Sequence, residues 1–316
     1  MKRLLVIRFS ALGDVAMLAP IVRATAEQYP EVEITVLSQE RMADLFACMP
    51  DNVRFHGVDI HQTSLREIAG GLDRYDYVAD MHGVWRSRYI RIKMALRGAR
   101  VRTIHKGRIN KFLLAHGMVH KPLKTTTVRY TDVLQKLGFP LLYSEASCIM
   151  PQHTGGNGIG VAPFAAHQGK IYPLDRMEKV VEILSKKGEK VVLFGGGRKE
   201  REVLEAWAAK YPGVVSVAGQ YSLVQGLELI RGLREMVSMD SANMHLASLA
   251  RTRVISIWGA THPYAGFCGI GQQESDCVQL DLKCRPCSVY GNKTCRFGDY
   301  RCMNIAPEEI IHKIYD

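Results

Sequence analysis

Strand-like and helix-like segments alternate along almost all of this 316-residue chain, and this alternation limits its fold more than any other feature. Short apolar runs are separated by longer segments with helical periodicity. Because such strands pair in parallel through helical crossovers, the pattern predicts parallel sheets with helices on both faces. The predicted strands cover 4–9, 33–37, 53–56, 77–81 and 100–104, then 159–162, 190–194, 214–217, 236–239 and 254–258. The predicted helices cover 15–29, 41–48, 65–72 and 85–96, then 174–187, 200–210, 223–231 and 242–250.

A stretch rich in turn-forming residues, 151–158, separates the two series and reads as a linker. We therefore expect two Rossmann-like, doubly wound domains, 1–152 and 153–316, facing one another across a cleft that binds ligands. No apolar run approaches the roughly 18 residues that a membrane span needs. The chain opens on a strand instead of a signal peptide, so we expect a cytoplasmic protein.

The net charge of +11 is concentrated in one segment. Residues 81–131 contain 13 Lys and Arg and neither Asp nor Glu, so the rest of the chain carries a net charge of −2. Such a local excess indicates an anionic partner. Nucleic acid, anionic lipid, and a phosphorylated or carboxylated substrate all fit it, as does a solvated basic surface.

Asp14 stands where the first predicted strand turns, through Ser10 and Gly13, into a helix. The dinucleotide fingerprint G-x-G-x-x-G is missing there, and a carboxylate occupies the helix N-terminus, where a phosphate would normally bind. The helix dipole favours its ionised form, which makes Asp14 a candidate general base; a purely helix-stabilising acid is the alternative. The strand end Asp80–His82, followed by Arg86, fits a sugar or acid site, although Asp80 is equally suited to capping a helix.

Three corners of the second half carry groups suited to phosphate. Gly195–Gly197 follows a predicted strand and permits close backbone approach, but glycine-rich loops are common. Lys170 follows another strand and can meet a diphosphate as a point charge, or be an ordinary surface lysine. Asp240 and Ser241 are good N-cap residues for a helix that includes His245, which is either a ligand-binding or a core histidine.

Taken in order, these corners resemble glycosyltransferase family 9, the ADP-heptose:lipopolysaccharide heptosyltransferases, over essentially the whole chain. The residues that carry the resemblance are Gly13-Asp14-Val15 with Pro20, Asp80-x-His82-Gly83 with Arg86-Ser87, Lys170-x-Tyr172-Pro173, Gly195-Gly196-Gly197, Gly219-x-Tyr221-Ser222-Leu223, Asp240-Ser241-x-x-Met244-His245-Leu246-Ala247 and the Cys-x-x-Cys tail. The resemblance implies a GT-B fold and an inverting transfer without an essential metal, with acceptor on the N-terminal domain and nucleotide sugar on the C-terminal one.

The resemblance also implies roles for individual residues. Asp14 resembles the catalytic base and Lys170 the lysine that contacts the donor diphosphate. The expected donor site adds Gly196, Glu200, Tyr221, Asp240, Ser241, Ala242 and His245, with Tyr221 and Glu200 near adenine and ribose. The expected acceptor site comprises Ser10, Gly13, His82, Arg86 and Arg88. The chain departs from the family where Ala242 replaces a frequent glycine and where Ala165 and Ala166 replace hydroxyl residues of some members, which leaves the donor's identity less constrained than the fold.

We therefore expect an inverting glycosyltransferase that moves a heptose, or a related sugar, from an ADP-sugar to an acidic lipopolysaccharide inner-core or lipid acceptor. The basic segment would attract this acceptor at the cytoplasmic face of the inner membrane, with peripheral membrane contact and no nucleic acid. The alternatives are a nucleotide-sugar epimerase of the same two-domain fold and a basic nucleic-acid- or lipid-binding module.

The tail contains four cysteines whose spacing permits a tetrahedral thiolate site: Cys284, Cys287, Cys295 and Cys302. Structural zinc is one interpretation; reduced thiols, disulfides or another metal are the others. Because these cysteines lie far along the chain from the proposed catalytic residues, we expect a structural role for the tail. We expect no cofactor that is essential for catalysis.

Overall fold

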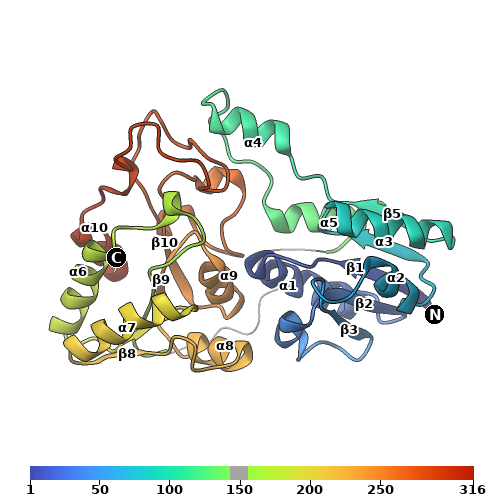
Figure 1. Cartoon of the computed structure of the whole chain (residues 1–316), viewed down its shortest axis with the longest axis horizontal. Coiled ribbons are helices and arrows are strands. Elements are labelled where there is room, and N and C mark those ends of the chain that lie inside the picture. Colours follow the sequence, from blue (N-terminus) through green and yellow to red (C-terminus); the bar gives the residue numbers. More distant parts are fainter. Residues whose placement is uncertain (143–155) are drawn as a thin grey trace. The chain divides into compact units, whose positions relative to one another are not determined.

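The computed structural model describes residues 1–142 and 156–316, which form two compact units (Figure 1). Within these residues, the first unit contains 1–106 and 126–142, and the second contains 107–125 and 156–316. The expected boundary between residues 152 and 153 lies outside the described residues. The sequence pattern gave no sign that 107–125 packs with the second unit.

A five-stranded parallel sheet forms the centre of the first unit. Its strands, in spatial order, are β3 (Val53–Val58), β2 (Val32–Gln39), β1 (Lys2–Ile7), β4 (Tyr77–Asp80) and β5 (Arg100–Thr103). The helical segments are α1 (Leu12–Gln28), η1 (Glu40–Phe46), α2 (Leu65–Gly71), α3 (Trp85–Leu96) and α5 (Thr126–Leu137). The strand order reverses between β1 and β4, so the carboxyl ends of these two strands lie side by side. Such a switch point is where open α/β sheets bind ligands.

Burial explains the uninterrupted apolar run that forms most of β1. Leu4 to Ile7 are all buried, as expected for a central parallel strand covered on both faces. The helix predicted over 41–48 is instead the 3₁₀ segment η1, in which Met42 and Leu45, three residues apart, both enter the core. Helix α5 was missed, although its buried residues follow helical spacing.

A six-stranded parallel sheet forms the centre of the second unit. Its strands, in spatial order, are β11 (Cys277–Val278), β10 (Arg253–Ile257), β9 (Glu235–Met239), β6 (Ile159–Ala162), β7 (Val191–Leu193) and β8 (Val214–Ser216). Its helical segments are α4 (Arg108–Ala115), η2 (Gln168–Lys170), α6 (Leu174–Lys186), α7 (Arg198–Lys210), α8 (Leu223–Arg231), α9 (Ala242–Leu249), η3 (Pro263–Ala265), η4 (Glu274–Asp276), η5 (Arg301–Met303) and α10 (Pro307–Tyr315). This sheet reverses its order between β6 and β9, so it also has a switch point.

The prediction of two parallel-sheet α/β units is confirmed. The C-terminal helix α10 closes the core of the second unit by burying Ile310, Ile311 and Ile314. Among the residues that the structure describes, no helix is long and apolar enough to cross a membrane.

Candidate active site

Asp14 lies at the N-terminus of α1, as the sequence predicted. It is the third residue of the helix, and its Oδ2 accepts a hydrogen bond from the Ala11 N–H over 3.3 Å. The same oxygen forms an ion pair with Arg8 Nη2 at 2.5 Å. The Asp14 side chain is 27% exposed, so it can meet an incoming hydroxyl while one oxygen stays held by Arg8.

Arg8 is the residue of this corner that the sequence analysis missed. It is buried, and its Nη1 donates to the Met81 carbonyl at 2.6 Å while Nη2 reaches Asp14. The guanidinium also lies over the Tyr130 ring, 5.8 Å from its centroid, and the Tyr130 hydroxyl donates to the Asp14 carbonyl over 3.1 Å. Burial lowers the pKa of Arg8, but the neighbouring Tyr130 and Asp14 raise it by more, so the pKa of Arg8 is above its ordinary value. A charged residue directly after a buried strand, six positions before Asp14, is the signal that could have revealed it.

Asp80 builds the neighbouring corner at the end of β4. Its side chain is fully buried; Oδ1 accepts from the N–H groups of His82 (3.0 Å) and Gly83 (2.8 Å), and Oδ2 pairs with Arg91 at 3.3 Å. Asp80 therefore does not cap α3, whose N-cap residue is Val84; it holds the loop that precedes the helix.

His82 faces the same corner as a neutral imidazole. Its Nδ1 accepts the Phe9 N–H at 3.4 Å, which assigns the hydrogen to Nε2. Burial, followed by the nearby charges of Arg8 and Lys106, lowers the pKa of His82 to about 3. The ring can therefore donate one hydrogen bond at neutral pH without carrying charge.

The remaining predicted acceptor residues differ in their surroundings. Ser10 is partly buried beside this corner and Gly13 is buried in the first turn of α1. Arg86 lies over the Trp85 ring, 5.4 Å from its centroid, and contributes to the lowered pKa of His82. Arg88 is exposed on α3. The structure thus groups Asp14, His82 and Arg86, and leaves Arg88 on the outer face of α3.

Lys170 and Asp240 meet at the switch point of the second unit. Lys170 Nζ lies 2.8 Å from Asp240 Oδ2, and Thr261 Oγ1 donates to the same oxygen over 2.9 Å. Both side chains are largely buried, with 15% of the lysine and 4% of the aspartate side chain exposed. The lysine therefore already has a carboxylate partner at the place where the sequence predicted a diphosphate.

The N-terminus of α9 adjoins this pair. Ser241 is the N-cap residue, but its side chain makes no capping hydrogen bond; its Oγ lies 3.3 Å from Ser238 Oγ instead. Ser241 therefore occupies the N-cap position that its residue type suggested, but without a side-chain capping bond. Ala242 is the first residue of the helix, and His245 is buried one turn further on.

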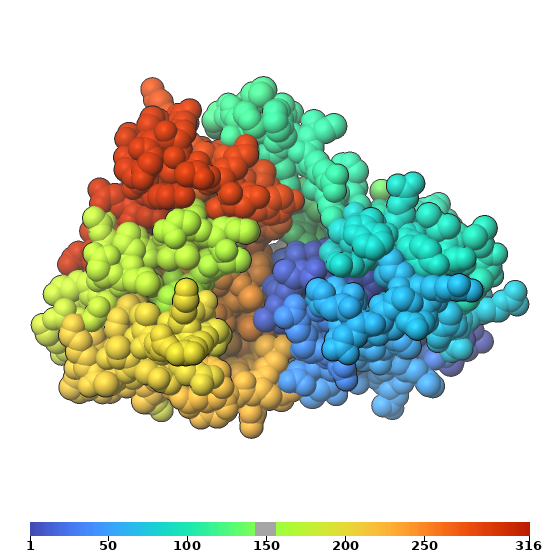
Figure 2. Space-filling model, viewed as in Figure 1, coloured from blue at the N-terminus to red at the C-terminus, as the bar shows by residue number. Residues whose placement is uncertain are grey.

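The Cys-rich tail packs against Lys170, although its cysteines lie far along the chain from that residue. Gly291 has a φ of +74°, and a Cβ added there would lie 2.6 Å from Lys170 Cγ. The backbone continues the contact: Cys287 N–H donates to the Ala260 carbonyl (3.1 Å), and Ala260 N–H donates to the Gly169 carbonyl (2.8 Å). Figure 2 shows the red C-terminal segment directly against the yellow-green segment that includes Lys170.

The glycine-rich loop before α7 is held by its own helix. Glu200 Oε2 accepts the Gly196 N–H at 2.7 Å. A Cβ at Gly195 would lie 2.7 Å from Leu204 Cδ1, whereas one at Gly197 would meet nothing within 4 Å. Packing against Leu204 therefore explains why residue 195 is a glycine, whereas the backbone at Gly197 is accessible to a ligand. Tyr221, on the neighbouring loop, is about half exposed.

The zinc prediction for Cys284, Cys287, Cys295 and Cys302 is not supported. In residues 1–142 and 156–316, no group of three or more His, Cys, Asp or Glu side chains is arranged to hold a metal ion. All four cysteines are free thiols. Burial raises the pKa of the Cys302 thiol to about 11, so this side chain is a neutral thiol at neutral pH.

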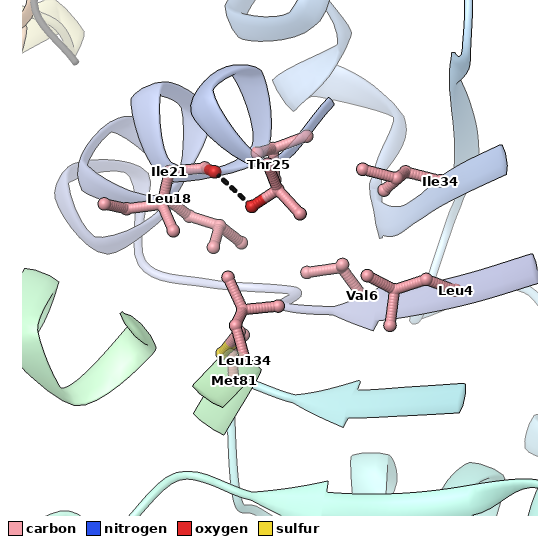
Figure 3. A pocket seen from close by; sticks show the side chains of 9 residues that line it. Leu4, Val6, Leu18, Ile21, Thr25, Ile34, Met81 and Leu134 are labelled. Carbon is pink, nitrogen blue, oxygen red and sulfur yellow. Dashed lines mark hydrogen bonds between the residues drawn. The ribbon is translucent and has the colours of Figure 1, made fainter. Parts of the chain in front are cut away.

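The apolar gap between α1 and the first sheet is part of the core and carries no chemistry (Figure 3). Leu4, Val6 and Leu134 are among the residues that line it. Its one hydroxyl, that of Thr25, donates to the Ile21 carbonyl over 2.6 Å and is satisfied within the helix.

The chain is similar to known proteins over most of its length. The family model described as glycosyltransferase family 9 (heptosyltransferase) matches residues 71–300. The chain is 25% identical to lipooligosaccharide heptosyltransferase 2 of Haemophilus ducreyi, over 83% of this chain and 84% of the relative. It is 22% identical to lipopolysaccharide heptosyltransferase 3 of Escherichia coli, over 79% of this chain and 81% of the relative.

A solved structure supports the fold. The ADP-heptose lps heptosyltransferase II of E. coli superposes with a TM-score of 0.69 at 21% identity, covering 100% of this chain and 98% of that one. The GT-B fold class is therefore confirmed.

Proposed function

Because this chain belongs to glycosyltransferase family 9 and is therefore a glycosyltransferase, we propose that it transfers a heptose, or a closely related sugar, from an ADP-sugar to an acidic lipopolysaccharide inner-core acceptor, with inversion. The observation that carries the proposal is the position of the Asp14 carboxylate and its ion pair with Arg8. This carboxylate stands at a helix N-terminus, with one oxygen held by Arg8 and part of its surface exposed. A carboxylate held in this way suits a general base for a hydroxyl group.

The acceptor would bind the corner formed by the ends of β1 and β4. Asp14 Oδ1 takes the proton of the acceptor hydroxyl while Arg8 keeps Oδ2 in place. The neutral His82 donates from Nε2 to an acceptor oxygen, and Arg86 offers a cation to an acidic substituent. The acceptor oxygen then attacks the anomeric carbon from the face opposite the departing ADP, so the configuration inverts.

The donor would bind the corner formed by the ends of β6 and β9. As the bond from the anomeric carbon to the diphosphate oxygen breaks, its electron pair stays with ADP. Lys170 and the N-terminus of α9 stabilise this negative charge. The diphosphate competes with Asp240 for Lys170, which lies at 2.8 Å from that carboxylate in the present structure.

The nucleoside would contact the loops around Gly196, Glu200 and Tyr221. Glu200 already accepts the Gly196 N–H through one oxygen, which leaves the other oxygen for a ribose hydroxyl. The half-exposed Tyr221 ring offers a surface on which adenine can stack. The similar E. coli structure is that of an ADP-heptose lps heptosyltransferase, which supports ADP as the nucleotide of the donor.

The basic segment supports an anionic acceptor. Within the first unit, the absence of acidic residues from 81 to 106 creates a positive field around the end of β4, where α3 begins. We place the protein at the cytoplasmic face of the inner membrane, in peripheral contact with it, because the proposed acceptor is lipid-linked. No cofactor is assigned to the reaction.

Release of ADP from ADP-heptose tests the proposal directly. ADP should appear only when a lipopolysaccharide inner-core acceptor is added, and Asp14→Asn should remove most turnover while ADP binding measured by calorimetry stays near that of the unchanged protein. Conversion of ADP-heptose without an acceptor would instead identify an epimerase. Near-normal turnover of Asp14→Asn would show that another group is the base.

A further inference from the structure

Helix α3 exposes three large apolar side chains along one line. Trp85 is 67% exposed, Ile92 47% and Leu96 79%. At about 100° per residue, positions 85, 92 and 96 fall within a stripe about 40° wide on the helix surface. We call these three residues the outer stripe of α3.

The core-facing side of α3 is a separate surface. Ser87, Ile90 and Met94 are buried, and they lie about 180° from the outer stripe at the same angle per residue. A surface helix of a globular protein normally has one apolar face, which packs on its own core. The outer stripe is therefore not accounted for by the packing of the first unit.

Cations line both sides of the outer stripe. Arg88 follows one side, and Lys93 and Arg86 follow the other, as their positions on the helix require. Lys93 lies over the Tyr89 ring, 5.8 Å from its centroid, and Arg86 lies over Trp85. The edge strand β5, which packs beside α3, adds the exposed Arg100. No acidic residue of the segment 81–131 opposes this charge.

We propose that α3 is the membrane-contacting element of this protein and lies on an anionic bilayer with its outer stripe at the headgroup–acyl boundary. An apolar stripe flanked by Arg and Lys matches such a boundary: the apolar side chains leave water and the cations stay among lipid phosphates. Nucleic acid would satisfy the cations but would leave the two aliphatic side chains exposed.

The inference deepens the proposed function, on which it rests for the lipid-linked nature of the acceptor. Helix α3 begins at Trp85, three residues after His82 of the acceptor corner. Docking of α3 on the bilayer would therefore hold that corner close to the surface where a lipid-linked saccharide projects.

Tryptophan fluorescence provides the test, because the three tryptophans of the chain differ sharply in exposure. Trp85 is exposed, whereas Trp207 and Trp258 are buried. On titration with mixed phosphatidylcholine–phosphatidylglycerol vesicles, the emission should shift to the blue, and Trp85→Phe should abolish the shift. Pure phosphatidylcholine vesicles and high salt should weaken binding, since the phosphate attraction is lost or screened.

The variant Ile92→Ser/Leu96→Ser keeps Trp85 as the probe and removes the aliphatic part of the outer stripe. Its partition onto anionic vesicles should fall about tenfold or more, because two apolar side chains no longer leave water. The matched control is Val215→Ser/Val224→Ser, which removes two exposed apolar side chains from the second unit and should bind like the unchanged protein. Thermal unfolding of both variants checks that the fold is retained.

Three results would overturn the inference: no blue shift on anionic vesicles, unchanged partition of the α3 variant, or an equal blue shift with duplex DNA. Because these vesicles contain neither donor nor acceptor, the result is separate from that of the transferase assay. Vesicle binding without ADP release would refute only the proposed function, and ADP release from a detergent-solubilised acceptor without vesicle binding would refute only the membrane role of α3.

Discussion

Replacing Arg8 should damage catalysis more than it damages the fold. Arg8 is a positioning residue that links the ends of β1 and β4. Its Nη2 lies 2.5 Å from Asp14 Oδ2, and its Nη1 donates to the Met81 carbonyl over 2.6 Å. In Arg8→Met, Asp14 Oδ2 and the Met81 carbonyl oxygen both lose the guanidinium as their donor. The Asp14 side chain can then leave the position in which it meets the acceptor hydroxyl. A displacement of about 1 Å typically costs about 100-fold in rate, so we expect kcat to fall by about that factor.

The cost to stability follows from the same contacts. A charge-assisted hydrogen bond contributes about 1.5–3 kcal/mol, and breaking a fully buried ion pair costs about 3–5 kcal/mol. Because 27% of the Asp14 side chain is exposed, water compensates part of the lost pair. We therefore expect the free energy of unfolding of Arg8→Met to fall by about 2–3 kcal/mol, which urea denaturation can measure.

Steady-state kinetics of two Arg8 variants separate positioning from a general loss of structure. The KM for the ADP-sugar should stay within about twofold in Arg8→Met, since Arg8 belongs to the acceptor corner. Arg8→Lys keeps the charge but lacks the planar fork that bridges two oxygens, so it should restore stability more fully than kcat. A folded Arg8→Met variant with kcat near that of the unchanged protein would refute the reasoning, as would equal losses in both variants.

Three further predictions concern the tail, the pH dependence of stability and metals. Gly291→Val should weaken ADP binding in calorimetry, because a side chain at this left-handed position would displace Lys170; Gly298→Ala, also at positive φ (+76°) but with nothing within 4 Å, is the control, and equal effects would contradict the contact. The depressed pKa of His82, about 3, means that the unfolded chain gains a proton below about pH 6.5 while the folded one does not. Stability should therefore be lost as pH falls from about 6.5 towards 3, by at most about 1.4 kcal/mol per pH unit from this residue, and His82→Asn should flatten that slope in pH-dependent denaturation. Chelator treatment should change neither the melting temperature nor ADP release; a drop in melting temperature would revive a metal role for the tail cysteines.

The sequence alone determined the type of fold and the corners where chemistry could occur. Apolar runs such as Leu4 to Ile7, separated by helical periodicity, are local properties that a single stretch of chain displays. The same local signals placed Asp14 at the start of a helix and a glycine loop before another. They failed at 41–48, where a seven-residue segment forms a 3₁₀ turn whose buried residues satisfy a helical pattern equally well.

Only the tertiary structure decided which corners meet within each unit. The order of the strands places the end of β1 beside that of β4, and so brings Arg8 and Asp14 next to His82. It also pairs Lys170 with Asp240, 70 positions further along the chain, and lays Gly291 of the tail against the lysine. Strand order and such long-range contacts depend on competition among non-local pairings. The periodicity within one segment therefore does not predict the strand order or these contacts.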